Sequence, residues 1–166
     1  MDVQPNQKDS TLRLMTLLEG TWKGEGKGFF PTIEDFDYGE TTIFIRRDDG
    51  SLSYIQRTEK LQTDEKTYLP SHEESGVIRV LENGKLILSN TQSGGRTEIL
   101  NGIVEDLRDM IEVVFTSQTL TNDERMVSSG RRWEVEQGIM RYEMEMKTTA
   151  VDKSVPHLRA ELRKVG

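Results

Sequence analysis

From Gly20 onward, apolar and polar residues alternate with the period of two that half-buried β-strands show. The alternation is clearest over residues 139–147, where every second side chain is apolar: Met140, Tyr142, Met144 and Met146. It returns over residues 157–164. Further strands are expected near residues 42–46, 52–58, 77–81, 86–88, 96–101, 112–116 and 131–136.

Short turns separate these strands. Asn83-Gly84 is a strong hairpin signal, because a type I′ turn needs positive φ at both central residues. Pro31 and Gly39 are expected to frame an ordered loop between the first two strands. The spacing leaves no room for helical crossovers, so we predict an all-β, antiparallel up-and-down barrel of the lipocalin or fatty-acid-binding-protein type. A barrel of about ten strands is too wide to fill with its own side chains and tends to enclose a ligand cavity.

The N-terminal segment differs from the rest of the chain. Residues 1–9 are polar and are predicted to form a disordered tail. Ser10 or Thr11 is the expected N-cap of one or two turns of amphipathic helix over residues 12–18. We expect residues 10–166 to form a single barrel domain.

Composition narrows the functional classes. The 166 residues carry 22 basic and 29 acidic side chains, a formal net charge of −7, which argues against nucleic acid or an anionic membrane as partner. The absence of cysteine excludes disulfides and thiolate metal sites. Without an apolar run of about 20 residues or a signal-peptide core, we expect a cytoplasmic protein, a monomer or a homodimer.

A glycine-rich segment opens the first strand: Gly20, Trp22, Gly24 and Gly26 alternate with polar residues. Glycine weakens a strand and marks a bend or the close approach of another group. The simplest interpretation is a bent strand whose Trp22 plugs the floor of the barrel. The segment does not match a phosphate-binding loop.

The chain has two histidines, His72 and His157. A neutral imidazole is the usual proximal ligand of heme iron, but a histidine beside a loop more often serves a surface or hydrogen-bonding role. Strict alternation places His157 on the outward face with Arg159 and Glu161. A ligand role therefore requires an irregularity near Pro156.

No other catalytic group emerges. Ser71, His72 and Glu73 are sequence neighbours and cannot assemble a triad. Two histidines do not complete a zinc site. Glu73, Glu74 and the remaining carboxylates are expected to be solvated on polar strand faces. The methionines of strand 139–147 suit either an ordinary core or the wall of a cavity around a large planar ligand.

Five short motifs, in order, resemble the nitrobindin family: Gly20-Thr-Trp22-Lys-Gly24-Glu-Gly26, Pro31-Thr32-Ile33, Tyr38-Gly39-Glu40, His72-Glu-Glu-Ser75-Gly76 and Pro156-His157-Leu158. This resemblance implies a ten-stranded barrel that holds one heme b per chain. It also implies nitric oxide binding and isomerisation of peroxynitrite to nitrate, so the protein is a candidate peroxynitrite isomerase with no catalytic group beyond the heme iron.

The resemblance also assigns residues to the site. His157 would be the axial ligand of ferric iron, Thr32 would lie close to the heme, and His72 would approach the pocket edge. Met144 and Met146, on the predicted inner face, would complete the cofactor-binding residues.

Two other functions remain open from the residues alone. The first is a carrier of a fatty acid or another small apolar ligand, without iron chemistry. It needs a polar group inside the barrel for the ligand's carboxylate, and Arg96, Arg131 and Tyr142 are candidates. The second is a structural or binding module with no small-molecule ligand.

Overall fold

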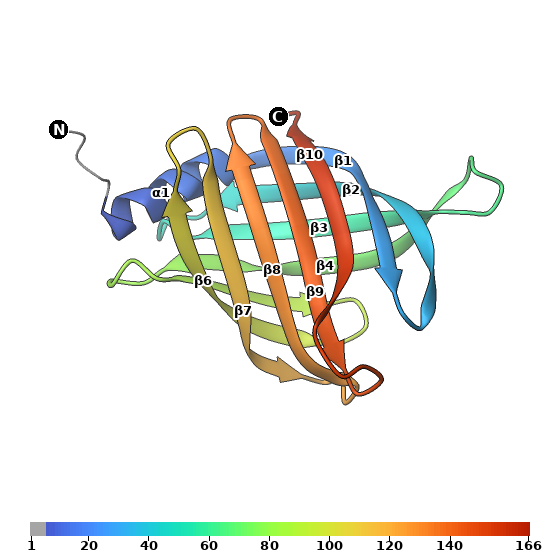
Figure 1. Cartoon of the computed structure of the whole chain (residues 1–166). Helices are drawn as coiled ribbons and strands as arrows, with labels where there is room; N and C mark the ends of the chain where they lie inside the picture. The colour runs from blue at the N-terminus through green and yellow to red at the C-terminus, as the bar shows by residue number, and fades with distance from the viewer. Residues whose placement is uncertain (1–5) are drawn as a thin grey trace.

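The computed structural model in Figure 1 describes residues 6–166, which form a closed barrel of ten antiparallel strands with one helix at its end. Each strand pairs with its neighbours in sequence, and the first strand closes the barrel against the last. The strands are β1 (Gly20–Phe30), β2 (Ile33–Arg46), β3 (Leu52–Leu61), β4 (Tyr68–Val80), β5 (Leu86–Gln92), β6 (Thr97–Asp106), β7 (Ile111–Thr121), β8 (Met126–Glu136), β9 (Ile139–Thr148) and β10 (Val155–Lys164). The predicted up-and-down barrel is confirmed.

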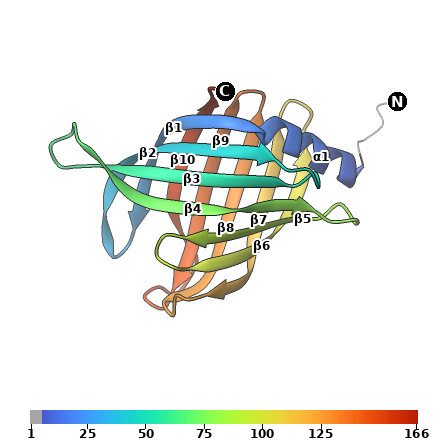
Figure 2. The same cartoon turned by 180° about the vertical axis from the view of Figure 1, so that it is seen from behind.

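The two halves of the barrel cross at a steep angle. In Figures 1 and 2, β6 to β10 run across β1 to β4, and the long β3–β4 hairpin projects beyond the barrel. In the part of the chain that the structure describes, no helix is long and apolar enough to span a bilayer.

Helix α1 (Gln7–Leu18) begins earlier than predicted. Asn6, and not Ser10 or Thr11, is the N-cap, because its side chain accepts a hydrogen bond from the Asp9 backbone N–H at 2.9 Å. Of the predicted tail, residues 1–5 lie outside the described residues and Gln7 onward is helical.

The helix closes one end of the barrel. Its fully buried residues Leu14, Met15 and Leu18 pack into the core beside Trp22. The Trp22 indole N–H donates to the Leu18 carbonyl at 2.7 Å. Trp22 therefore plugs this end of the barrel as predicted, which leaves the opposite end as the open one.

Two predicted connections differ from the structure. The turn at Asn83-Gly84 is in the expected place, but only Gly84 has positive φ, so it is not a type I′ turn. The predicted loop between Pro31 and Gly39 is wrong, because β2 starts directly after a two-residue turn at Pro31 and Thr32.

The glycines of β1 make room for aromatic rings from β2. A Cβ atom at Gly26 would lie 2.4 Å from Cζ of Tyr38, and one at Gly28 would lie 2.1 Å from Cζ of Phe36. Both distances are far shorter than a carbon–carbon contact allows. The glycine-rich segment thus lets Phe36 and Tyr38 lie against β1.

Candidate functional site

A cavity of about 230 Å³ lies towards the open end of the barrel. Aromatic, polar and apolar side chains line it, from six strands and, for Arg96, from the β5–β6 turn: Phe36, Tyr38, Gln56, Thr58, Ser71, His72, Glu74, Gln92, Arg96, Met144, His157 and Leu158. Both histidines of the chain are therefore brought to one cavity, although 85 positions separate them in the sequence (157 − 72).

A β-bulge turns His157 into this cavity. In the pairing of β10 with β9, Pro156 is opposite Glu145 and Leu158 is opposite Met144, so His157 is an extra residue on β10. His157 and Leu158, although consecutive, both line the cavity. The irregularity near Pro156 that a ligand role requires is present, and regular alternation does not hold at this position.

Backbone contacts fix the state of the His157 ring. Its Nδ1 lies 3.0 Å from the carbonyl oxygen of Phe29. A carbonyl can only accept a hydrogen bond, so Nδ1 carries the proton and Nε2 keeps its lone pair. Burial lowers the pKa of His157, against the opposing effect of the Phe29 hydrogen bond. The ring is therefore a neutral imidazole at neutral pH, with Nε2 available as a metal ligand.

The other predicted site residues divide into two groups. His72 and Met144 line the cavity with His157. Met146 lies two residues further along β9, is only partly buried and does not line it. Thr32 is exposed at the tip of the β1–β2 hairpin and is not part of the cavity wall.

The cavity adjoins a wider hollow of about 600 Å³, with which it shares Met144 and Leu158. This hollow extends along β7 to β10. The pairing of β7 with β8 stops at Thr116 and Gly130, although β7 continues to Thr121. The barrel wall is thus open on one side of the cavity, where a large planar ligand can enter.

A network of buried charges lies deeper in the barrel. The Arg131 guanidinium donates to both oxygens of Glu74, at 2.6 and 2.9 Å, and to Glu98 at 3.0 Å. All three residues are at most 4% exposed. The Tyr54 hydroxyl donates to Glu74 at 2.5 Å, and His72 Nε2 lies 3.9 Å from the same carboxylate. The expectation that Glu74 is solvated is wrong.

A second buried network contains no cation. Glu40 is 4% exposed and accepts hydrogen bonds from Thr42 at 2.7 Å, from Gln56 at 3.0 Å and from the Tyr142 hydroxyl. The hydroxyl oxygens of Tyr142 and Tyr38 are 2.7 Å apart. Because Tyr38 lines the cavity, this network connects the cavity to a buried carboxyl group.

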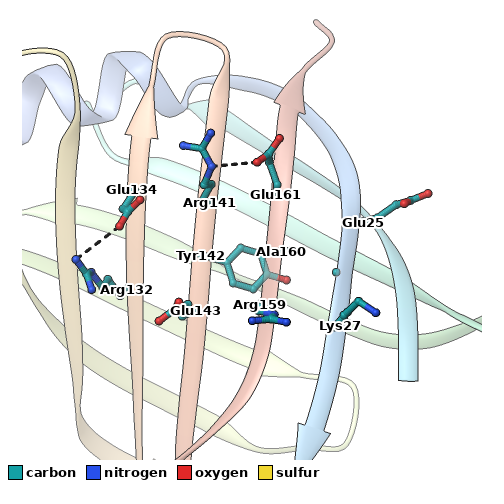
Figure 3. Close-up of a pocket in the computed structure, with 11 residues that line it drawn as sticks. Glu25, Lys27, Arg132, Glu134, Arg141, Tyr142, Glu143, Arg159, Ala160 and Glu161 are labelled. Carbon is teal, nitrogen blue, oxygen red and sulfur yellow. Dashed lines mark hydrogen bonds and ion pairs between the residues drawn. The ribbon is translucent and has the colours of Figure 1, made fainter. Parts of the chain in front are cut away.

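The outer face of β8, β9, β10 and β1 has a different character. Figure 3 shows a hollow there with charged side chains on adjacent strands. Arg141 pairs with Glu161 at 3.0 Å, and Arg132 lies 3.6 Å from Glu134. This surface carries exposed ion pairs between adjacent strands and is unsuited to an apolar ligand.

Known proteins with similar sequences identify the family of this barrel. A family model described as the THAP4-like, heme-binding β-barrel domain matches residues 11–164. The chain belongs to this family. It is 32% identical over 151 residues to a relative from Arabidopsis thaliana named peroxynitrite isomerase Rv2717c, covering 91% of this chain and 87% of the relative.

Two further comparisons agree. The chain is 34% identical over 99 residues to a ferric nitrobindin-like protein from Corynebacterium jeikeium, covering 59% of this chain and 46% of that protein. The crystal structure of Rv2717c from M. tuberculosis superposes with a TM-score of 0.85 at 25% identity, covering 99% of this chain and all of that one. The resemblance to the nitrobindin family is confirmed, and heme is the cofactor of this domain.

The cavity of this heme-binding barrel fits such a cofactor. A histidine binds heme iron through an unprotonated ring nitrogen, and the tautomer that Phe29 imposes on His157 leaves Nε2 in that state. Phe36, Met144 and Leu158 provide apolar wall, and the gap beyond Gly130 leaves the cavity open to a large ring.

The sequence did not assign Phe36, Tyr38, Glu40 or Glu74 to the site, although the last three lie within the family motifs. One signal was available: the inward alternation of residues 42–46 extends back through Glu40, Tyr38 and Phe36. For Glu74 the signal was weaker: Ile78 and Val80 flank the polar Arg79, and the same parity extended back through Gly76 reaches Glu74 and not Glu73.

Proposed function

We propose that His157 Nε2 is the axial ligand of the heme, and that the domain binds nitric oxide and isomerises peroxynitrite to nitrate. The observation that carries the proposal is the β-bulge that brings His157 into the cavity with its Nδ1 fixed by the Phe29 carbonyl. The names of the relatives support the reaction. The cofactor supplies the iron chemistry on the ligand, as heme does in other proteins.

The chain's own residues hold and shield the cofactor. His157 ligates from the β10 wall, and its edge-on contact with Phe30, with ring centroids 5.9 Å apart, restricts rotation of the imidazole. Met144 and Leu158 exclude water from the adjoining wall. His72, 36% exposed, lies at the boundary between cavity and solvent, where it can contact an entering anion.

The test is a titration of the apoprotein with hemin, followed by absorption spectroscopy. We expect a saturable Soret band in the wild type and its loss, or affinity at least about tenfold weaker, in His157→Ala, since losing an axial bond removes more than the roughly 1.4 kcal/mol of a tenfold change. His72→Ala is the matched control, because it removes the other imidazole of the same cavity and should retain saturable binding. Equal affinity of His157→Ala and the wild type would rule out axial ligation by His157.

The reaction is tested on the same heme-loaded samples. Addition of nitric oxide should shift the Soret band. Peroxynitrite should disappear faster with the heme-loaded wild type than with the apoprotein, with nitrate as the product. A normal Soret band without faster decay would leave the ligation intact and reject the isomerase activity.

The structure favours this function over fatty-acid carriage. A carboxylate headgroup inside a barrel needs a cation whose charge is not already compensated. Arg131 is shared by Glu74 and Glu98, Tyr142 donates to Glu40, and Arg96 lies 3.5 Å from Glu98. The remaining deep cavity measures only about 20 Å³. We therefore expect no saturable displacement of a fluorescent fatty acid.

A further inference from the structure

The two tyrosines between the cavity and Glu40 form a directed hydrogen-bonded chain. A hydroxyl has one proton to donate, and that of Tyr142 goes to the Glu40 carboxylate. The proton between the two phenols must therefore come from Tyr38, across 2.7 Å. The order of donation is Tyr38 to Tyr142 to Glu40, which leads from the cavity wall into the core.

All three residues of this hydrogen-bonded series are buried. Tyr38 is 2% exposed, and Tyr142 and Glu40 are each 4% exposed. Gly26 admits the phenol of Tyr38, since a Cβ atom there would lie 2.5 Å from its hydroxyl oxygen. The three donors to Glu40 are all neutral, so hydrogen bonds alone stabilise its charge. Such a carboxylate gains from accepting a proton.

We propose that Tyr38 and Tyr142 form a redox-active pair that donates one electron to the heme when a peroxide oxidises it, with Glu40 as the proton acceptor. Tyr38 gives one electron to the oxidised cofactor and its proton to the Tyr142 oxygen, and Tyr142 passes its own proton to Glu40. The products are a neutral phenoxyl radical on Tyr38, an intact Tyr142 and a protonated Glu40. With hydrogen peroxide, the O–O bond breaks, two protons come from solvent, and the two electrons that yield water come from the heme and from Tyr38.

The Tyr54–Glu74 pair in the same barrel resembles the Tyr142–Glu40 pair but should not be redox-active. Tyr54 also donates to a buried carboxylate, but its partner Glu74 is held by Nη1 and Nη2 of Arg131. A proton transferred to Glu74 would break this ion pair and leave Arg131 with Glu98 alone. Tyr54 is also absent from the wall of the heme cavity. It therefore lacks both the proton acceptor and the proximity of the Tyr38 pair.

The inference rests on the proposed heme site, so each sample is first checked for a normal Soret band. The heme-loaded protein is then mixed with hydrogen peroxide, frozen within milliseconds to seconds, and examined by electron paramagnetic resonance. We expect a phenoxyl signal in the wild type that narrows when the protein carries ring-deuterated tyrosine. Tyr38→Phe should lose this signal. Glu40→Gln, which keeps both phenols and can keep the hydrogen bond, should weaken it several-fold.

Two variants serve as controls, since the chain has four tyrosines. Tyr68→Phe removes the 41% exposed tyrosine of the β3–β4 hairpin, and Tyr54→Phe removes the one bound to Glu74. Both should retain the wild-type signal. A full signal in Glu40→Gln or Tyr38→Phe with normal heme uptake would overturn this inference alone, as would a signal insensitive to deuterated tyrosine. Absence of a Soret band in the wild type would overturn the heme site and the inference together.

Discussion

Glu40 and Glu74 occupy similar positions in the barrel, yet their chemistry is opposite. Both project inward, both are at most 4% exposed, and both accept a hydrogen bond from a buried tyrosine. Glu74 also binds Arg131 through two hydrogen bonds, whereas the donors to Glu40 are a threonine, a glutamine and a tyrosine. The main difference between the two carboxylates is therefore the guanidinium of Arg131, and His72, 3.9 Å from Glu74, is a second and more distant one.

Arg131 outweighs the effect of burial on the pKa of Glu74. Burial raises the pKa of Glu40, and its neutral hydrogen bonds only reduce that rise. Burial acts on Glu74 in the same way, but Arg131, together with His72 and Tyr54, brings its pKa well below the ordinary value. Glu74 is therefore a fixed anion that organises the core, while Glu40 can exchange a proton with groups at the cavity.

Removal of the Arg131 guanidinium should have the largest effect on the free energy of unfolding. Arg131→Met leaves Glu74 and Glu98 buried without a counter-ion, and such a loss costs about 3–5 kcal/mol of unfolding free energy at neutral pH. Urea unfolding monitored by circular dichroism measures it. Arg132→Met is the matched control, because its side chain is 51% exposed and its pair with Glu112 should contribute under about 1 kcal/mol. Equal losses in the two variants would refute the assignment of the buried network.

Neutralising Glu74 should destabilise the fold in a pH-dependent way. The folded-state pKa of Glu74 lies below its unfolded value, so its charge stabilises the fold above an unfolded pKa of about 4.3, and this contribution fades as pH falls towards the folded value. Glu74→Gln should therefore cost about 1.5–3 kcal/mol near neutral pH, the range for hydrogen bonds to charged groups, and less near pH 3.

The control for this variant is Glu73→Gln, its exposed neighbour on β4 that pairs with Arg57 at 3.1 Å. It should change the urea midpoint little at either pH. A loss in Glu74→Gln that stays constant between the two pH values would show that packing, and not charge, is what the variant removes.

The contrast between these carboxylates also shows how far sequence reasoning reaches. Local patterns located the strands of the C-terminal half and the plug at Trp22, because a strand's period and a tryptophan's burial depend on nearby residues. The motif around His157 carried the family and the candidate ligand. Its inward orientation could not follow from alternation, since a bulge breaks the period by one residue.

Interior charges were the part that local patterns could not predict. Alternation shows which face a residue lies on but not which charges meet there: Glu74 was expected to be solvated, and Arg131 was an interior candidate only as a partner for a ligand's carboxylate. Arg131 meets Glu74 across 57 positions of sequence, and only closure of the barrel brings them together. The glycine at position 26 was recognised as a close approach, but its partner Tyr38 depends on the register of β1 with β2.

The smallest effect on stability is expected at Glu40, and its sign should be opposite to that at Glu74. The folded-state pKa of Glu40 lies above its unfolded value, so the wild type loses stability as pH rises from about 4.3 through the folded value. Glu40→Gln removes this loss while its amide can still accept from Tyr142 and donate to Thr42. The variant should therefore match the wild type near pH 4 and equal or exceed it, by up to about 1 kcal/mol, near pH 8.

Urea midpoints of the two proteins at both pH values measure this difference, and Glu74→Gln in the same series provides the opposite slope. If Glu40→Gln instead lost stability increasingly with pH, Glu40 would be an ionised, stabilising anion like Glu74. The carboxyl group would then be a poor acceptor for the proton of Tyr142, and the distinction between the two buried tyrosine–glutamate pairs would fail at its source.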